Sequence, residues 1–130
     1  MSKFCLLSGC VLALLGVVFG AFGAHALTDK LTPDSLQSYE TAVRYQFYHA
    51  FALLICGVLA FKIEASLLKA PSYLFLVGTI LFSGSIYLLS TRAITGITQT
   101  KILGPITPIG GTLLIIAWAL LAVQIYRSTN

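Results

Sequence analysis

Four long stretches of this 130-residue chain contain no Asp, Glu, Lys or Arg. They comprise residues 4–27, 45–61, 72–91 and 106–126. A helix that crosses a hydrocarbon core of about 30 Å needs about 20 residues, within a range of about 17–25, and all four stretches fall in that range. Their continuous rather than alternating apolar character favours helices over the strands of a barrel. The pattern predicts an all-α integral membrane bundle of four transmembrane helices in a single domain, residues 1–130.

The scarcity of charge excludes a soluble protein. Charged residues make up 9% of the chain and hydrophobic residues 58%, whereas a soluble domain carries about 25% charged residues. A chain this small has too little interior to hide so much apolar surface from water. Its net charge of +4 comes from Lys and Arg residues that occur singly, without the basic patch of a nucleic-acid-binding protein. We therefore expect the lipid bilayer as a partner and no nucleic acid.

The segments between the spans contain helix start and stop signals. Residues 32–34 read Thr-Pro-Asp, in which threonine caps a helix, proline fits its first turn and aspartate favours its positive end. Apolar and aromatic residues then recur at three- and four-residue steps through residues 36–47. We expect an amphipathic helix that begins near Pro33 and leads into the second span. We interpret residues 62–71 as a turn, residues 92–105 as a loop and Thr-Pro at 107–108 as the start of the fourth span.

The distribution of Lys and Arg bears on orientation. Four spans place both termini on one side of the membrane. The basic residues on that side are Lys3, Lys62, Lys69 and Arg127. Those on the opposite side are Lys30, Arg44, Arg92 and Lys101. The positive-inside rule compares these numbers, which are equal. The compact basic flanks on the terminal side favour cytoplasmic termini.

Small residues predict where the helices approach one another. Lipid tails are as apolar as leucine, so helices in a bilayer associate through close packing of small side chains. The first span has small residues at four-residue steps and a further glycine beside them, namely Gly16, Gly20, Ala24 and Gly23. The third and fourth spans contribute Ser83, Gly84, Gly110 and Gly111. We expect contacts within one bundle, and the alternative is an interface with a second copy or a partner membrane protein.

Polar and aromatic residues near one membrane face form a candidate site. They are His25, Arg44, Tyr45, Gln46, Tyr48, His49 and Arg92. Ionisable groups at membrane depth are costly and mark functional positions. His25 closes the first span and His49 lies five residues into the second. Because these spans run antiparallel, we expect both histidines toward the same face.

Three functions are compatible with these residues. The histidines could ligate haem iron from two helices. They could relay protons or bind a small anionic solute together with the arginines. They could also form an interhelical network, with the tyrosines as an aromatic belt. We favour the network, and with it an accessory, structural or interaction protein. The sequence shows no catalytic motif and no metal-ligand spacing, so we expect no enzyme activity, metal or cofactor.

Four motifs resemble those of a known family. They lie in order along the chain at residues 20–27, 41–50, 81–87 and 104–111. Their sequences are GAFGAHAL, TAVRYQFYHA, LFSGSIY and GPITPIGG. These resemble the signatures of the domain-of-unknown-function 423 family, the YgdD-like small four-helix membrane proteins. The resemblance implies four spans and a place in the inner, or plasma, membrane, and it implies no activity.

Overall fold

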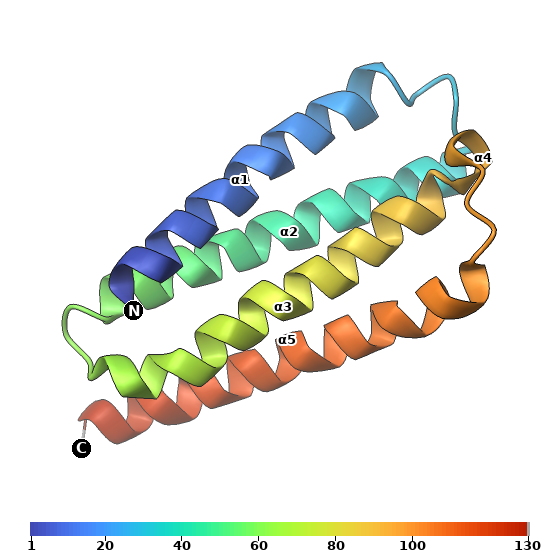
Figure 1. Ribbon diagram of the computed structural model, residues 1–130. Coiled ribbons are helices and arrows are strands. Elements are labelled where there is room, and N and C mark those ends of the chain that lie inside the picture. The colour runs from blue at the N-terminus through green and yellow to red at the C-terminus, as the bar shows by residue number, and fades with distance from the viewer. Residues whose placement is uncertain (130) are drawn as a thin grey trace.

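The computed structural model describes residues 1–129, through which four long helices run antiparallel (Figure 1). The elements are α1 (Ser2–His25), α2 (Pro33–Leu59), α3 (Ala65–Ser90), the short α4 (Arg92–Thr95) and α5 (Thr100–Thr129). Helices α1, α2, α3 and α5 are each long and apolar enough to cross a membrane. Strands are absent from the described residues. The predicted all-α fold with four membrane-spanning helices is therefore confirmed.

Helix α2 begins at the predicted cap. The Thr32 hydroxyl accepts a hydrogen bond from the backbone N–H of Ser35 at 3.3 Å, and Pro33 is the first helical residue. The 27 residues of α2 give a length of about 40 Å, which exceeds a hydrocarbon core of about 30 Å. The amphipathic segment and the second span are therefore one continuous helix.

Helix α3 begins earlier than predicted. The sequence predicts a turn over residues 62–71, whereas α3 starts at Ala65 and contains Pro71. Proline removes the hydrogen bond to the carbonyl four residues before it, which is that of Leu67. This carbonyl lies in the first turn of the helix, close to the charged Lys69. A non-helical segment at this place would leave more backbone groups unpaired in lipid, so the helix continues through the proline.

Helix α5 also begins earlier than predicted, six residues before position 106. The predicted loop contains α4, and Gly96 ends that helix with a left-handed φ of 70°. Pro105 and Pro108 both lie inside α5. Thr107 does not cap a helix. Its hydroxyl lies 2.7 Å from the hydroxyl of Ser85 on α3, so Thr107 joins two helices instead of starting one.

The long helices form a row. Each packs against its neighbour in the chain, α1 on α2, α2 on α3 and α3 on α5, whereas α1 and α5 make no close backbone approach within residues 1–129 (Figure 1). Burial follows this order, because 44% and 33% of the most apolar stretches of α2 and α3 are buried, against 22% in α1 and in α5. The outer helices therefore present most of their surface to lipid.

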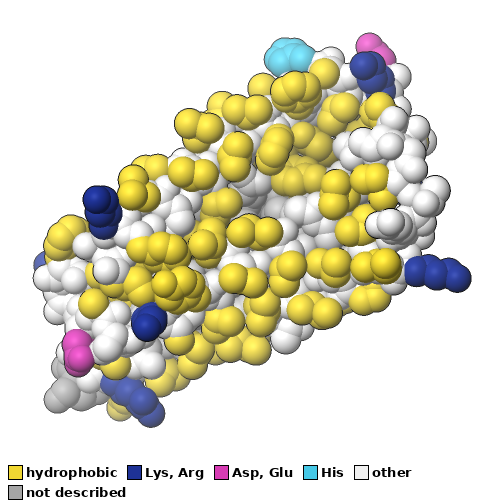
Figure 2. Space-filling view, viewed as in Figure 1, with side chains coloured by type: hydrophobic (Ala, Val, Ile, Leu, Met, Phe, Trp, Pro, Cys, Tyr) yellow, Lys and Arg dark blue, Asp and Glu magenta, His cyan; other side chains and the backbone are white. Residues whose placement is uncertain are grey.

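Apolar and charged side chains are separated along the row. Hydrophobic side chains cover the middle of the face shown in Figure 2, and charged side chains gather toward its two ends. The interior contains a cluster of fully or almost fully buried side chains from all four long helices, among them Cys5, Leu53, Cys56, Leu68, Phe75, Leu114 and Ala117. This separation is the one expected of a protein that spans a bilayer.

Glycines bring α1 close to α2. Gly9, Gly16 and Gly23 are buried at seven-residue steps, and a Cβ at each would lie within 2.8 Å of a larger α2 side chain. These α2 side chains are Leu54, Phe47 and Tyr39. The contact line differs from the predicted four-residue line, since Gly20 is half-buried and Ala24 is exposed. A four-residue step turns about 40° around a helix, whereas seven residues keep nearly the same face toward a partner.

Glycines also bring α3 close to α5. A Cβ at Gly78 would lie 2.8 Å from a leucine side chain of α5, and one at Gly110 would meet the backbone of Phe82. The neighbouring Gly111 has the Phe82 ring at 3.5 Å, and Gly84 has no atom within 4 Å of a built Cβ. Of the glycines predicted to pack in these two helices, Gly110 therefore makes the closest contact, and Gly84 makes none of this kind.

Candidate functional site

Gln46 joins three helices. Its side chain is 3% exposed. Its Nε2 donates a hydrogen bond to the carbonyl of Leu12 on α1 at 2.7 Å, and its Oε1 accepts one from the Tyr87 hydroxyl on α3 at 2.8 Å. Both ends of the amide are therefore used in contacts between helices.

Further hydrogen bonds surround Gln46. The Tyr39 hydroxyl donates to the carbonyl of Phe19 at 2.8 Å, so α2 is bonded to α1 a second time. The buried Ser83 hydroxyl donates to the carbonyl of Ala42 at 2.9 Å, so α3 is bonded to α2 a second time. The rings of Tyr39 and Tyr87 also contact each other, with centroids 5.0 Å apart and planes tilted by 57°. These side chains extend the candidate site beyond the predicted residues.

His49 is buried at the side of α2 that faces α5, with 4% of its surface exposed. Its Nδ1 lies 2.6 Å from the carbonyl oxygen of Tyr45. A carbonyl oxygen only accepts hydrogen bonds, so the proton of the ring lies on Nδ1. The other nitrogen, Nε2, then accepts from the indole N–H of Trp118 on α5 at 3.4 Å. Trp118 is a contact that the sequence analysis missed, because no local pattern links it to α2.

The two histidines lie far apart, contrary to the expectation that they share a membrane face. Leu6 packs on Gly57, and Gly16 packs on Phe47. The two helices are antiparallel, so moving one residue forward along α1 matches moving one residue backward along α2. This pairing places the exposed His25 eleven residues from the level of His49, or about 16 Å. The reason is the length of α2, whose first turns lie beside the end of α1. Joint ligation of haem by these histidines does not fit this geometry.

A groove adjoins His49. It has a volume of about 500 Å³ and lies between α2 and α5. Its lining comprises Tyr45, Tyr48, His49, Phe82, Gly111, Leu114, Ile115 and Trp118. Tyr45 and Tyr48 are 40% and 52% exposed, so they line a lipid-facing groove and not an internal channel.

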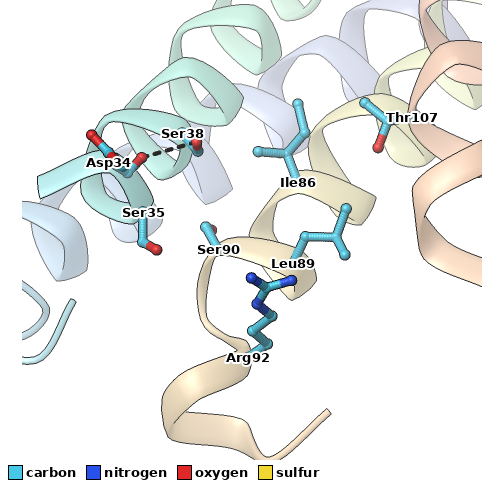
Figure 3. A pocket seen from close by; sticks show the side chains of 8 residues that line it. All are labelled: Asp34, Ser35, Ser38, Ile86, Leu89, Ser90, Arg92 and Thr107. Atoms are coloured by element: carbon cyan, nitrogen blue, oxygen red, sulfur yellow. Dashed lines mark hydrogen bonds between the residues drawn. The ribbon is translucent and has the colours of Figure 1, made fainter. Parts of the chain in front are cut away.

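Arg92 lies in a different pocket, at the end of the row formed by the connections α1–α2 and α3–α5. Figure 3 shows this pocket, which has a volume of about 350 Å³. The side chains that line it are Asp34, Ser35, Ser38, Ile86, Leu89, Ser90, Arg92 and Thr107. The Ser38 hydroxyl donates to the backbone carbonyl of Asp34 at 3.0 Å. The pocket therefore combines hydroxyl groups with one acidic and one basic side chain.

Arg44 lines a third groove, between α1 and α2 on the outside of the row. Its volume is about 260 Å³. The lining residues are Gly20, Gly23, Ala24, Tyr39, Glu40, Val43, Arg44, Phe47, Tyr48 and Phe51. The predicted site residues thus fall into separate places. Gln46 and His49 face neighbouring helices, Arg44 is exposed in the groove between α1 and α2, Arg92 lies at the end of the row, and His25 is exposed.

A family profile and individual relatives place the chain in the same family. The profile described as "Protein of unknown function (DUF423)" matches residues 19–111. The UPF0382 membrane protein YwdK of Bacillus subtilis is 41% identical over 122 residues, which cover 93% of this chain and 94% of the relative. The UPF0382 membrane proteins SAB0533 of Staphylococcus aureus and SH2409 of Staphylococcus haemolyticus are 41% and 39% identical over 125 residues, covering 96% of this chain and 97% of each relative.

No solved structure matches the chain. The family profile covers most of the chain, and the relatives are similar over nearly its full length. Both agree with the four motifs noted in the sequence and with the four membrane-spanning helices. The chain therefore belongs to the DUF423 family of small membrane proteins of unknown function.

Proposed function

We propose that this chain is an accessory protein of the plasma (inner) membrane, which associates laterally with lipids and membrane proteins and conducts no solute. The observation that supports this most is the use of buried polar side chains as bonds between helices, by Gln46, His49 and Ser83. Among the described residues, a single buried side-chain polar atom, Oε1 of Gln124, has no hydrogen-bond partner. Groups that hold helices together are not free to pass a proton or solute along a path.

Lateral association is supported by the shape of the row. The grooves beside His49 and Arg44 are open to the sides of the molecule and have mainly apolar or aromatic linings. Such surfaces suit acyl chains and transmembrane helices. A second copy of the chain and a different membrane protein are both partners of this kind.

We also propose that both termini are cytoplasmic. The numbers of Lys and Arg at the two ends are equal. The terminal end has its basic residues close to the helix ends, as Lys3 near the start of α1, Lys69 near the start of α3 and Arg127 near the end of α5. Basic residues in short flanks next to the membrane have the largest influence on orientation.

A proton-flux measurement tests the absence of conduction. Purified protein is reconstituted into liposomes that contain a pH-sensitive dye, with valinomycin and potassium to remove the membrane potential. After an acid step outside, we expect the internal pH to fall no faster than in protein-free liposomes. Any protein-dependent flux would contradict the proposal, and its loss in His49→Ala would assign the flux to this histidine. An added protonophore serves as the positive control.

A second candidate function is the binding of a small polar solute in the pocket of Arg92. The observation that favours it is the group of hydroxyls beside one acidic and one basic side chain in that pocket (Figure 3). A solute with both a positive and a negative group would match Asp34 and Arg92. Thermal stabilisation of the purified protein by zwitterionic solutes, lost in Arg92→Gln, would support this candidate.

A further inference from the structure

The groove between α1 and α2 carries two opposite charges in line along one helix. Glu40 and Arg44 both line it and both are exposed. They are four residues apart, so they lie on the same side of α2, about 6 Å apart along its axis. Glu40 is the closer of the two to the start of α2, and therefore to the membrane surface.

Arg44 lies unusually deep for an exposed charge. It is eleven residues after Pro33, or about 16 Å from the start of α2. Of the other basic residues of this end, Lys30 lies in the connection α1–α2, Arg92 begins the short α4, and Lys101 lies in the first turn of α5. A charged side chain in contact with lipid at such depth is costly unless it reaches a polar group. A lipid phosphate is a polar group of opposite charge that is present at this surface.

Farther from the surface, the same groove is lined by aromatic side chains. Phe47, Tyr48 and Phe51 follow Arg44 along α2, away from that surface, and all three line the groove. Gly20 of α1 lines the opposite wall of the groove, where the absence of a side chain widens it. The lining is therefore apolar where acyl chains lie and charged toward the headgroups.

We propose that this groove binds an ethanolamine phospholipid. Arg44 binds the phosphate through charge-assisted hydrogen bonds, Glu40 binds the ammonium group, and an acyl chain lies along Phe47 and Phe51. The order along α2 matches the lipid, in which chain, phosphate and ammonium follow one another toward water. The inference rests on the lateral association with lipid proposed above and names the lipid class.

Charge complementarity separates this lipid from the other common classes. A phospholipid with a glycerol headgroup, phosphatidylglycerol, presents its phosphate to Arg44 but offers no positive group to Glu40. A choline phospholipid has a positive group, but its three methyl groups replace the N–H donors that a carboxylate binds. An ethanolamine headgroup satisfies both side chains at once.

Native mass spectrometry tests the proposal with the full chain in mild detergent. The protein is mixed with equal amounts of phosphatidylethanolamine, phosphatidylglycerol and phosphatidylcholine of identical acyl chains. We expect the ethanolamine lipid to form the major bound species, by about fivefold or more. Equal binding of all three, or a preference for phosphatidylglycerol, would overturn the proposal. This comparison uses unaltered protein and does not depend on the folding of a variant.

Variants assign the binding to the groove. We expect Arg44→Gln to reduce ethanolamine-lipid binding about tenfold, and Glu40→Gln to abolish the preference over phosphatidylglycerol. The exchange Glu40→Arg with Arg44→Glu keeps the net charge and should also abolish the preference, because the order of the charges is reversed. Lys101→Gln, an exposed basic residue at the same end, is the matched control and should bind normally. Equal loss in the control would place the lipid elsewhere.

A direct ion pair of Glu40 with Arg44, without lipid, makes a different prediction. It would give no lipid preference in the unaltered protein, so it is one of the results that overturn the proposal. The proton-flux measurement is independent of this one. If the protein shows neither a lipid preference nor flux, the lipid proposal fails and the accessory role stands. If it shows a lipid preference together with flux, the accessory role fails and the lipid proposal stands.

Discussion

A carboxamide is suited to joining helices because its nitrogen donates hydrogen bonds and its oxygen accepts them. Gln46 uses both, toward Leu12 on one side and Tyr87 on the other. Hydrogen bonds between transmembrane helices contribute about 0.6 kcal/mol each on average and up to about 1.7 kcal/mol. The larger effect of this residue comes from what its loss leaves unpaired, since a buried polar group without a partner costs about 1–3 kcal/mol.

Replacement of Gln46 by leucine tests this role. The side chain keeps a similar size, but the Tyr87 hydroxyl loses its acceptor. We expect Gln46→Leu to lower the free energy of unfolding by about 1–3 kcal/mol, measured by denaturation in mixed micelles of dodecyl sulfate followed by circular dichroism. Gln37→Leu, at an exposed position of the same helix, is the control. Equal stability of the two variants would show that Gln46 does not join the helices.

Tyr87→Phe completes the measurement at this site. It removes the other partner of the same hydrogen bond. If the two groups interact, the double variant with Gln46→Leu is less destabilised than the sum of the single variants. Additive effects would mean that the bond contributes nothing to stability.

At the scale of the helices, glycine positions set how closely neighbours approach. The contact between α3 and α5 depends on Gly110, because the backbone of Phe82 occupies the place where a Cβ would be. Backbone cannot move aside as the end of a flexible side chain can. A Cβ built at the adjacent Gly111 would lie 3.5 Å from the Phe82 ring, which is an ordinary contact distance. The two neighbouring glycines therefore differ in how tightly they are packed.

The pair Gly110→Ala and Gly111→Ala separates packing from helix propensity. Alanine favours a helix over glycine by about 1 kcal/mol at both positions. Overpacking costs about 1–3 kcal/mol or more, and we expect it at Gly110 only. Denaturation in mixed micelles should therefore show Gly110→Ala to be the less stable variant by at least about 1 kcal/mol. Equal stability would mean that α3 and α5 are farther apart than described.

At the scale of the whole molecule, the chain places both termini at the same end of the row (Figure 1). The connections α1–α2 and α3–α5 lie at the opposite end, and α2–α3 lies with the termini. Every charge therefore lies toward one of two surfaces, with Arg44 as the deepest exposed one at its end. The membrane orientation of one end therefore fixes the orientation of all four long helices.

Reporter fusions measure that orientation. We expect green fluorescent protein fused after the last residue, or inserted near residue 63, to fluoresce, since it folds in the cytoplasm. Alkaline phosphatase inserted near residue 98 should be active, because it requires export. The reverse pattern would contradict cytoplasmic termini. The two fluorescent-protein positions are separated by α3 and α5, which should cross the membrane once each. Fluorescence at only one of them would contradict this pair of crossings.

The candidate site was predictable in part. Gln46 and His49 were singled out because polar groups at membrane depth need a partner, and the structure places both in bonds between helices. Their partners were not predictable. Trp118 lies 69 residues from His49, and Tyr87 lies 41 residues from Gln46, so these contacts depend on which helices are neighbours.

The sequence by itself determined the number of spans, their approximate places and the start of α2 at Pro33. These follow from local properties, because lipid forces each apolar stretch to pair its own backbone as a helix. The tertiary structure decided which face of each helix meets a neighbour, as with Gly9, Gly16 and Gly23, and that the row stays open between α1 and α5. In water a polar face marks the exterior of a helix. In a bilayer all faces are apolar, so only packing and a few hydrogen bonds distinguish them.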